Sequence, residues 1–211
     1  QMKDLDTTRD VAMAVLPEAP TRPREDLVRF IEEARITASL EHPNIVFVQL
    51  ESLFDVNTII GAEYESDPTP CFNRLAREYD SGLLYVSNIG GGTANVEFEV
   101  MSGFNMDFFG AGETPYNTII QETACETIVH TLRKHGYSST ALHNNTGTFF
   151  SRNQVYSNLG YDRFDSLEYM LEPKYNETGW ARDAVLVDEI LRSMESTPSR
   201  DLIFTIGVES H

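Results

Sequence analysis

Short apolar runs alternate with amphipathic helical patterns along most of the chain, and this alternation restricts the fold more than any other feature. The largely apolar run NIVFVQL at residues 44–50 has the length of a buried strand, and further strands are predicted at residues 82–87, 137–142 and 201–206. Helical patterns lie between the strands, at residues 69–79, after the glycines at 90–92, and at residues 118–135 and 180–194. Because strands that alternate with helices form parallel sheets covered on both faces, we predict an α/β fold, a three-layer sandwich around a mainly parallel sheet.

The two ends of the chain differ from this central pattern. Three prolines in LPEAPTRPR at residues 16–24 predict a linker, which leads into a short helix at residues 25–38, so that residues 1–40 precede a domain beginning near Pro43. Asp183 is the expected N-cap of the last helix. The chain stops at His211, just past a predicted buried strand, where open α/β sheets place ligand-binding residues. We therefore expect more of the sheet and of its site beyond His211.

The charge of the chain excludes one class of partner. Lys and Arg total 16 against 33 for Asp and Glu, giving a net charge of −17, which does not suit binding to nucleic acid or to anionic membrane surfaces. A polyanionic substrate would require a metal ion or a local basic pocket. Cys71 and Cys125 lie far apart without a CxxC pattern, so neither a zinc site nor a disulfide framework is indicated. The sequence contains neither an apolar run long enough to span a bilayer nor an opening signal peptide.

Two segments carry residues suited to phosphate chemistry. Glu51 follows the strand at 44–50, at the sheet edge where metal and phosphate sites gather. The run GGGTAN at residues 90–95 follows a predicted strand and opens a helix, so its backbone amides suit a phosphoryl group and Thr93 could act as a nucleophile beside a metal or base. Glu51 could equally be a solvated loop acid, and Thr93 could merely cap the helix.

Four ordered blocks of sequence carry a resemblance to a known family. They are PNIVFVQLESLFD, then TPCFNRLAREYDSGLLYVSNIGGGTANVEFEVMSGF, then LHNNTGTFFSRNQVYSNLGYDRFD, and finally TIGVESH. In this order they resemble the extracellular domain of lipoteichoic acid synthases and related phosphoglycerol transferases, in the sulfatase-like branch of the alkaline phosphatase superfamily. The resemblance covers roughly residues 43–211, and it implies that residues 41–211 are the N-terminal portion of a sulfatase-like catalytic domain.

The resemblance also implies a role for individual residues. Glu51 matches a metal-binding glutamate, and Thr93 matches a nucleophile that also touches the metal. Arg152 matches an arginine that contacts glycerol phosphate, and His211 matches a histidine of the substrate pocket. Phe150 stands where lipoteichoic acid synthases often carry Trp, which keeps an aromatic wall but loses an indole donor. The remaining metal ligands of the family, an Asp-His pair, would lie beyond His211, so we expect the chain alone to be inactive.

Two of these residues also have structural interpretations that the sequence leaves open. His143 lies in the same block as Arg152 and would line the pocket, although a hydrogen-bonded structural histidine is about as well supported. Arg152 could grip two phosphate oxygens, or it could form an ion pair with one of the many carboxylates of the chain.

The activity implied by the resemblance is a metal-dependent transfer. One Mn²⁺ or Mg²⁺ ion would assist Thr93 in taking glycerol phosphate from phosphatidylglycerol as a phospho-threonine, for transfer to a cell-envelope polymer or glycan. The expected location is the extracytoplasmic face of a bacterial cell membrane, with a membrane segment absent from this chain, or a released extracellular domain.

Several alternatives remain open at this stage. Sulfate-ester hydrolysis is suggested by TPCFNRLA, which is similar to a segment of many sulfatases, but Cys71 is followed by Phe-Asn-Arg and lacks the C/S-x-P-x-R setting that formylglycine formation needs. Phosphoethanolamine transfer and phosphodiester hydrolysis use similar threonine sites. A catalytically incomplete module that binds a polyanion or a glycan is the non-enzymatic alternative.

Overall fold

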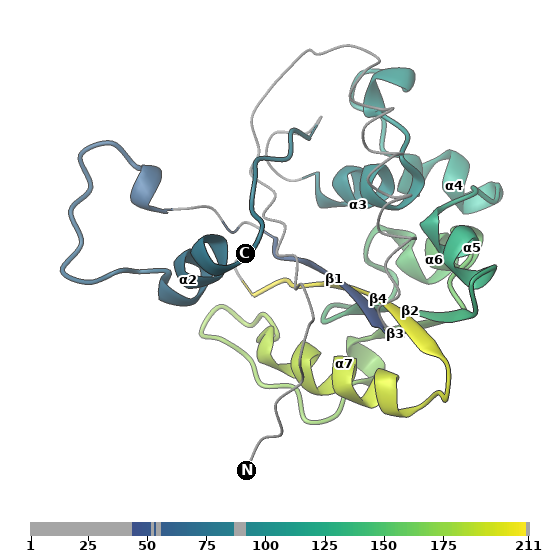
Figure 1. Ribbon diagram of the computed structural model, residues 1–211. Helices are drawn as coiled ribbons and strands as arrows, with labels where there is room; N and C mark the ends of the chain where they lie inside the picture. Colours follow the sequence, from purple (N-terminus) through teal and green to yellow (C-terminus); the bar gives the residue numbers. More distant parts are fainter. Residues whose placement is uncertain (1–43, 52, 54–55, 87–91, 210–211) are drawn as a thin grey trace.

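The computed structural model describes residues 44–51, 53, 56–86 and 92–209 (Figure 1). The linker and the helix expected within residues 1–40, and the chain end at His211, lie outside these described residues.

A parallel sheet of four strands forms the centre of the described structure. The strands are β1 (Asn44–Gln49), β2 (Tyr137–His143), β3 (Arg163–Ser166) and β4 (Arg200–Ile206), arranged in the order β1-β4-β2-β3. Every pair of neighbours is parallel, so all four carboxyl ends lie at one edge of the sheet. The predicted parallel sheet is confirmed, and with it the strands at 44–50, 137–142 and 201–206. The burial predicted for the first strand is wrong, because β1 lies at an edge of the described sheet and Val46, Val48 and Leu50 are exposed.

Helices cover both faces of this sheet (Figure 1). On one face lie α3 (Thr93–Ser102), α4 (Ile119–Glu122), α5 (Ile128–Arg133) and α6 (Arg152–Asn158), and on the other lies α7 (Ala184–Glu195). Strand β4 contributes to both interfaces, because successive side chains of a strand point to opposite faces. Phe204 belongs to the larger apolar cluster under α3 to α6, whereas Ile203 packs against Leu186 of α7 in the smaller one. The three-layer prediction is therefore confirmed.

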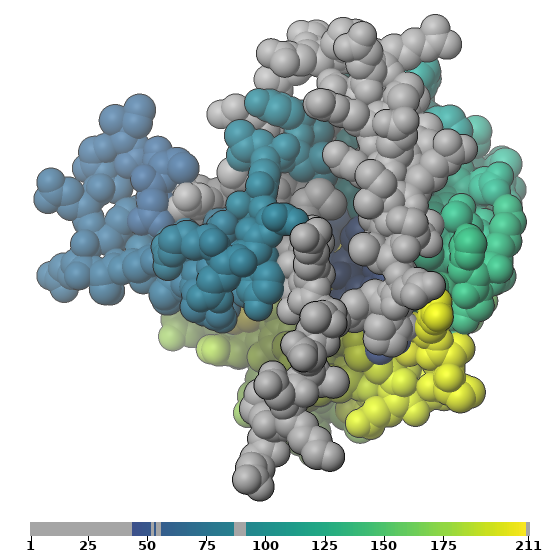
Figure 2. Space-filling view, viewed as in Figure 1, coloured from purple at the N-terminus to yellow at the C-terminus, as the bar shows by residue number. Residues whose placement is uncertain are grey.

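One helix lies apart from this core. Helix α2 (Pro70–Glu78) has no buried residue, and neither has the short 3₁₀ turn η1 (Val56–Thr58) that precedes it. In Figure 2 this part of the chain forms a blue lobe at the side of the molecule. Because few of its residues contact the sheet, burial of apolar side chains contributes little to holding this lobe in place. Four further 3₁₀ turns connect the elements: η2 (Met106–Phe108), η3 (Pro115–Asn117), η4 (Phe149–Ser151) and η5 (Leu167–Tyr169).

Two expectations about secondary structure are wrong. Residues 82–86 form no strand of the described sheet, and Leu83 and Tyr85 are 64% and 70% exposed, so their apolar pattern does not reflect burial. The single helix expected at 118–135 is two helices, because Thr127 begins α5 with a capping box and donates a hydrogen bond to the carbonyl of Leu159 (2.8 Å). Strand β3 and helix α6 were not predicted.

Asp183 occupies the N-cap position of α7, as predicted, but its side chain makes no capping hydrogen bond to the helix. Instead, Oδ1 accepts the backbone N–H groups of Val208 (2.8 Å) and Glu209 (3.1 Å) and the side-chain amide of Asn144 (2.8 Å). A Cβ on Gly207 would lie 2.5 Å from Asp183 Oδ2, so only glycine fits this close approach. Asp183 therefore holds the segment after β4 rather than the start of α7.

No helix within the described ranges combines the length and the apolar character that crossing a membrane requires.

Candidate active site

Glu51 and Thr93 meet at the carboxyl edge of the sheet. Glu51 lies two residues beyond the end of β1, and Thr93 is the first residue of α3 after the N-cap Gly92. The hydroxyl of Thr93 donates a hydrogen bond to Oε1 of Glu51, although 42 residues separate the two. Gln49 at the end of β1 donates from Nε2 to the backbone oxygen of Thr93 (3.4 Å). The structure therefore brings together the two residues expected to carry the chemistry.

The helix expected after the glycines begins at Thr93. Gly90 and Gly91 lie outside the described residues, whereas Gly92 occupies the N-cap position. Thr93 is 8% exposed, and its hydroxyl faces Glu51 rather than capping α3. A capping role for Thr93 is thus not what the structure shows.

Arg152 lies in a buried ion pair with Glu97. Both side chains are fully buried, and Glu97 accepts from Nη2 and from Nε of Arg152, the latter at 3.1 Å. Tyr156 donates to the same carboxylate at 2.7 Å. Burial is the largest single effect on the pKa of Arg152 and lowers it, but the charge and hydrogen bonds of Glu97, together with Tyr156 and Tyr116, raise that pKa above its usual value. The ion-pair interpretation of Arg152 is therefore the one observed. The expected contact with glycerol phosphate would require the guanidinium to bind the ligand and Glu97 at the same time.

His143 extends this buried group from the end of β2. Arg152 Nη1 lies 3.2 Å from His143 Nε2, and His143 Nδ1 lies 3.0 Å from the carbonyl of Ile206 in β4. A guanidinium only donates, so Nε2 must accept and the proton must reside on Nδ1, which donates to Ile206. Burial and then the positive charge of Arg152 lower the pKa of His143 to about 4. His143 is therefore neutral at physiological pH, and in the described structure it is a fully hydrogen-bonded structural histidine.

The rings of Phe149 and Phe150 pack against each other, with ring centres 4.9 Å apart, and both lie beside the guanidinium of Arg152. The guanidinium carbon of Arg152 lies 5.5 Å from the centre of the Phe149 ring and 5.4 Å from that of Phe150, within the range of cation–π attraction. Phe150 and Ser151 both adopt a φ of 55°, a left-handed conformation that is strained for residues other than glycine. The Phe150 ring therefore packs beside the guanidinium of Arg152, on a backbone held in an uncommon conformation.

Glu97 and Tyr156 were not predicted as parts of the site. Glu97 lies one helical turn after Thr93, so the ion pair lies directly behind the nucleophile candidate on α3. One signal was available in the sequence, since Glu97 stands in the otherwise largely apolar run VEFEVM. A charged residue inside such a run needs a buried partner.

The described residues supply only part of a metal site. Glu51 Oε1 and Thr93 Oγ1 are hard oxygen donors of the kind that Mg²⁺ and Mn²⁺ prefer, and their hydrogen bond shows that they converge on one point. Among the described residues there is no group of three or more His, Cys, Asp or Glu side chains that could hold a metal ion. The pair thus fits a divalent cation as two of its ligands.

Comparison with known proteins decides the family. The sequence profile of the family described as Sulfatase matches residues 43–211. This chain belongs to the sulfatase family. As a sulfatase-family protein it shares 30% identity over 197 residues with a Rhizobium meliloti (strain 1021) protein described as "Putative cyclic beta-1,2-glucan modification protein", covering 92% of this chain and 30% of the relative. Lipoteichoic acid synthase 2 of Bacillus subtilis (strain 168) is 28% identical over 179 residues, covering 81% of this chain and 26% of the relative.

Solved structures show the same fold for this sulfatase-family chain. The lipoteichoic acid synthase LtaP from Listeria monocytogenes aligns with a TM-score of 0.67 and 22% identity, covering 80% of this chain and 41% of that structure. The Streptococcus pyogenes phosphoglycerol transferase GacH, solved in complex with sn-glycerol-1-phosphate, aligns with a TM-score of 0.70 and 21% identity, covering 92% and 54%. The chain thus spans less than a third of these curated relatives and about half of these solved structures.

Proposed function

We propose that this sulfatase-family protein transfers glycerol phosphate from phosphatidylglycerol to an acceptor through a covalent intermediate on Thr93. The observation that carries the proposal is the convergence of Thr93 Oγ1 on the Glu51 carboxylate at the carboxyl edge of the sheet. Two relatives support the class of reaction, since one is named as a lipoteichoic acid synthase and another as a phosphoglycerol transferase bound to glycerol phosphate.

The described residues have distinct tasks in this proposal. Glu51 holds the hydrogen of the Thr93 hydroxyl and is thereby placed to take it when the oxygen attacks phosphorus. The bond from phosphorus to the diacylglycerol oxygen then breaks, and an acceptor hydroxyl later displaces Thr93. Glu51 and Thr93 would also hold a Mn²⁺ or Mg²⁺ ion, which when bound supplies stabilisation of the developing negative charge.

A glycan is the acceptor that we propose. The relative that shares 30% identity over 92% of this chain is described in terms of a cyclic β-1,2-glucan. The location that goes with a lipid donor and an envelope glycan is the extracytoplasmic face of the cell membrane.

Thr93→Ala tests the nucleophile assignment. In the full-length protein we expect this variant to lose release of diacylglycerol from phosphatidylglycerol, because no other group takes the phosphoryl group. Intact mass spectrometry of the unmodified protein after brief exposure to substrate is expected to show the added mass of one glycerophosphoryl group, absent from the variant. Thr131→Ala, at an exposed position of α5, is the matched control and is expected to keep both signals. Turnover that persists in Thr93→Ala would refute the assignment.

A further inference from the structure

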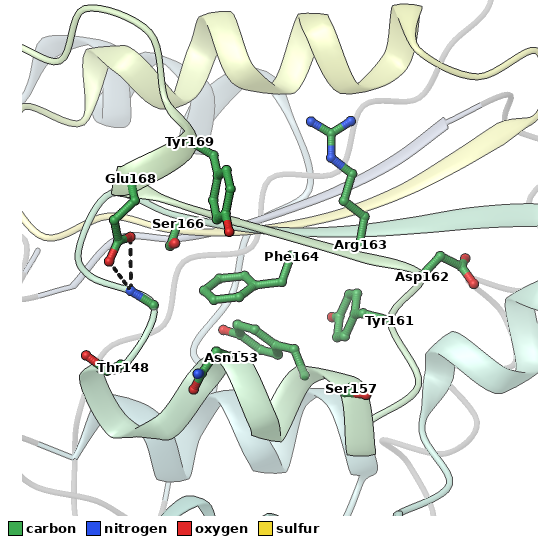
Figure 3. A pocket seen from close by; sticks show the side chains of 12 residues that line it. Thr148, Asn153, Ser157, Tyr161, Asp162, Arg163, Phe164, Ser166, Glu168 and Tyr169 are labelled. Carbon is green, nitrogen blue, oxygen red and sulfur yellow. Dashed lines mark hydrogen bonds between the residues drawn. The ribbon is translucent and has the colours of Figure 1, made fainter.

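A hollow lies between α6 and the segment formed by β3 and η5 (Figure 3). Its volume of about 460 Å³ falls within the range of small-molecule sites. Of the residues described for the candidate active site, Tyr156 alone lines it, and α6, which contributes Tyr156, also carries Arg152. The hollow therefore requires an explanation of its own.

Aromatic rings form part of the wall of this hollow. Phe164 projects into it from β3, and Tyr169 stands at its side (Figure 3). Tyr156 of α6 also lines it. Phe164 and Tyr156 pack at a ring-centre distance of 4.9 Å, which fixes the Phe164 ring. Tyr169 is 72% exposed, so its ring offers an accessible face. Such rings suit the C–H faces of a sugar, whose hydroxyls remain available at the edges.

Uncharged hydrogen-bonding groups complete the wall. Asn153 and Ser157 lie one turn apart on α6, and both are exposed. With Thr148 they present an amide and two hydroxyls, groups that both donate and accept. A ligand with several hydroxyl groups is the natural complement of such a set.

The charged groups around the hollow disfavour an anion. Arg163 forms an ion pair with Asp165, and Asp162 forms one with Arg133, so these charges are largely compensated. Glu168 accepts the backbone N–H of Gly147 at 3.2 Å from both carboxylate oxygens. A hydrogen bond from Ser166 lowers the pKa of Glu168, which keeps it ionised at neutral pH. A phosphate group would meet this negative charge, whereas a neutral sugar can donate hydroxyls to it.

We infer that this hollow binds a neutral sugar unit of the acceptor glycan, an inference that rests on the proposed transfer to a glycan. Its wall combines accessible aromatic faces, uncharged polar groups and a single uncompensated carboxylate, which together match a polyhydroxylated, uncharged ligand. Tyr156 connects the hollow to the ion pair behind Thr93, since its ring lines the hollow while its hydroxyl donates to Glu97.

Calorimetric titration of the full-length protein with a cyclic β-1,2-glucan tests the inference directly. We expect Tyr169→Ala to weaken binding about tenfold or more, because the exposed ring loses its stacking contact. Tyr85→Ala removes a ring of nearly equal exposure, 70%, that does not line the hollow, and it is expected to bind as the unmodified protein does. Thr93→Ala is likewise expected to bind the glucan normally, which separates binding from turnover.

The other outcomes are equally decisive. Absence of glucan binding by a protein that still consumes phosphatidylglycerol would overturn the sugar site and leave the transferase proposal standing. Glucan binding that depends on Tyr169 in a protein without turnover would support the site and refute the transferase. Titration with choline tests whether the hollow binds an organic cation instead. A protein that binds choline but no glucan, and that loses choline binding in Glu168→Gln, would show a cation site in place of the sugar site.

Discussion

At the scale of single residues, the ion pair between Glu97 and Arg152 is the most consequential feature. Removing one partner leaves a full charge buried without compensation. Glu97→Gln is therefore expected to lower the free energy of unfolding by about 3–5 kcal/mol, measured by urea denaturation of the full-length protein. Glu122→Gln, at an exposed position of α4, is the control and is expected to change it by less than about 0.5 kcal/mol.

A double variant makes the same prediction more specific. Combining Glu97→Gln with Arg152→Met removes both charges, so the loss of stability is expected to be smaller than in Glu97→Gln alone. A double variant that is less stable than the single one would show that Arg152 stabilises the fold independently of Glu97.

Site residues could be predicted where their position at the edge of the sheet follows from the order of strands and helices along the chain. Glu51 and Thr93 each follow a strand pattern or open a helix, and parallel strands bring such positions to one edge. The partner of Arg152 could not be predicted in this way, because 55 residues separate it from Glu97 and only the tertiary fold decides which carboxylate it meets.

At the scale of elements, the segment after β4 depends on a side chain from the start of α7. Asp183→Ala is expected to remove hydrogen-exchange protection from the amides of Val208 and Glu209, because both donate to its carboxylate. The amides of α7 are expected to keep their protection, since the side chain of Asp183, the N-cap residue, makes no hydrogen bond to that helix. The reverse pattern, with α7 exposed and the loop protected, would contradict this assignment.

Elements with strong local patterns were predicted, and those decided by long-range contacts were not. Strands β1 and β4 contain apolar runs and β2 has seven residues with apolar positions near both ends, whereas β3 has only the four residues RFDS and little pattern to recognise. The break between α4 and α5 is fixed from elsewhere in the chain, since Cys125 N–H donates to the carbonyl of Asn158 (3.0 Å) and Thr127 to that of Leu159.

At the scale of the whole molecule, a bound cation is expected to raise stability. If Glu51 and Thr93 hold Mn²⁺, an ion concentration of 100 times the dissociation constant raises the free energy of unfolding by about 2.7 kcal/mol. Thermal unfolding of the full-length protein is therefore expected to shift upward with Mn²⁺, and Glu51→Gln is expected to abolish most of the shift. Glu63→Gln, at an exposed position, is the control, and equal shifts in the two variants would place the ion elsewhere.

The order of strands has a further consequence for how the protein forms during synthesis. In the described sheet β1 pairs with β4, and Asn44 lies opposite Asp201, 157 residues later. Strand β1 therefore has to wait for β4 to leave the ribosome, which takes on the order of 10 s at typical rates of synthesis. Glu51 follows β1, so its approach to Thr93 is among the last events of folding, and the half-made chain exposes an unpaired apolar strand until then.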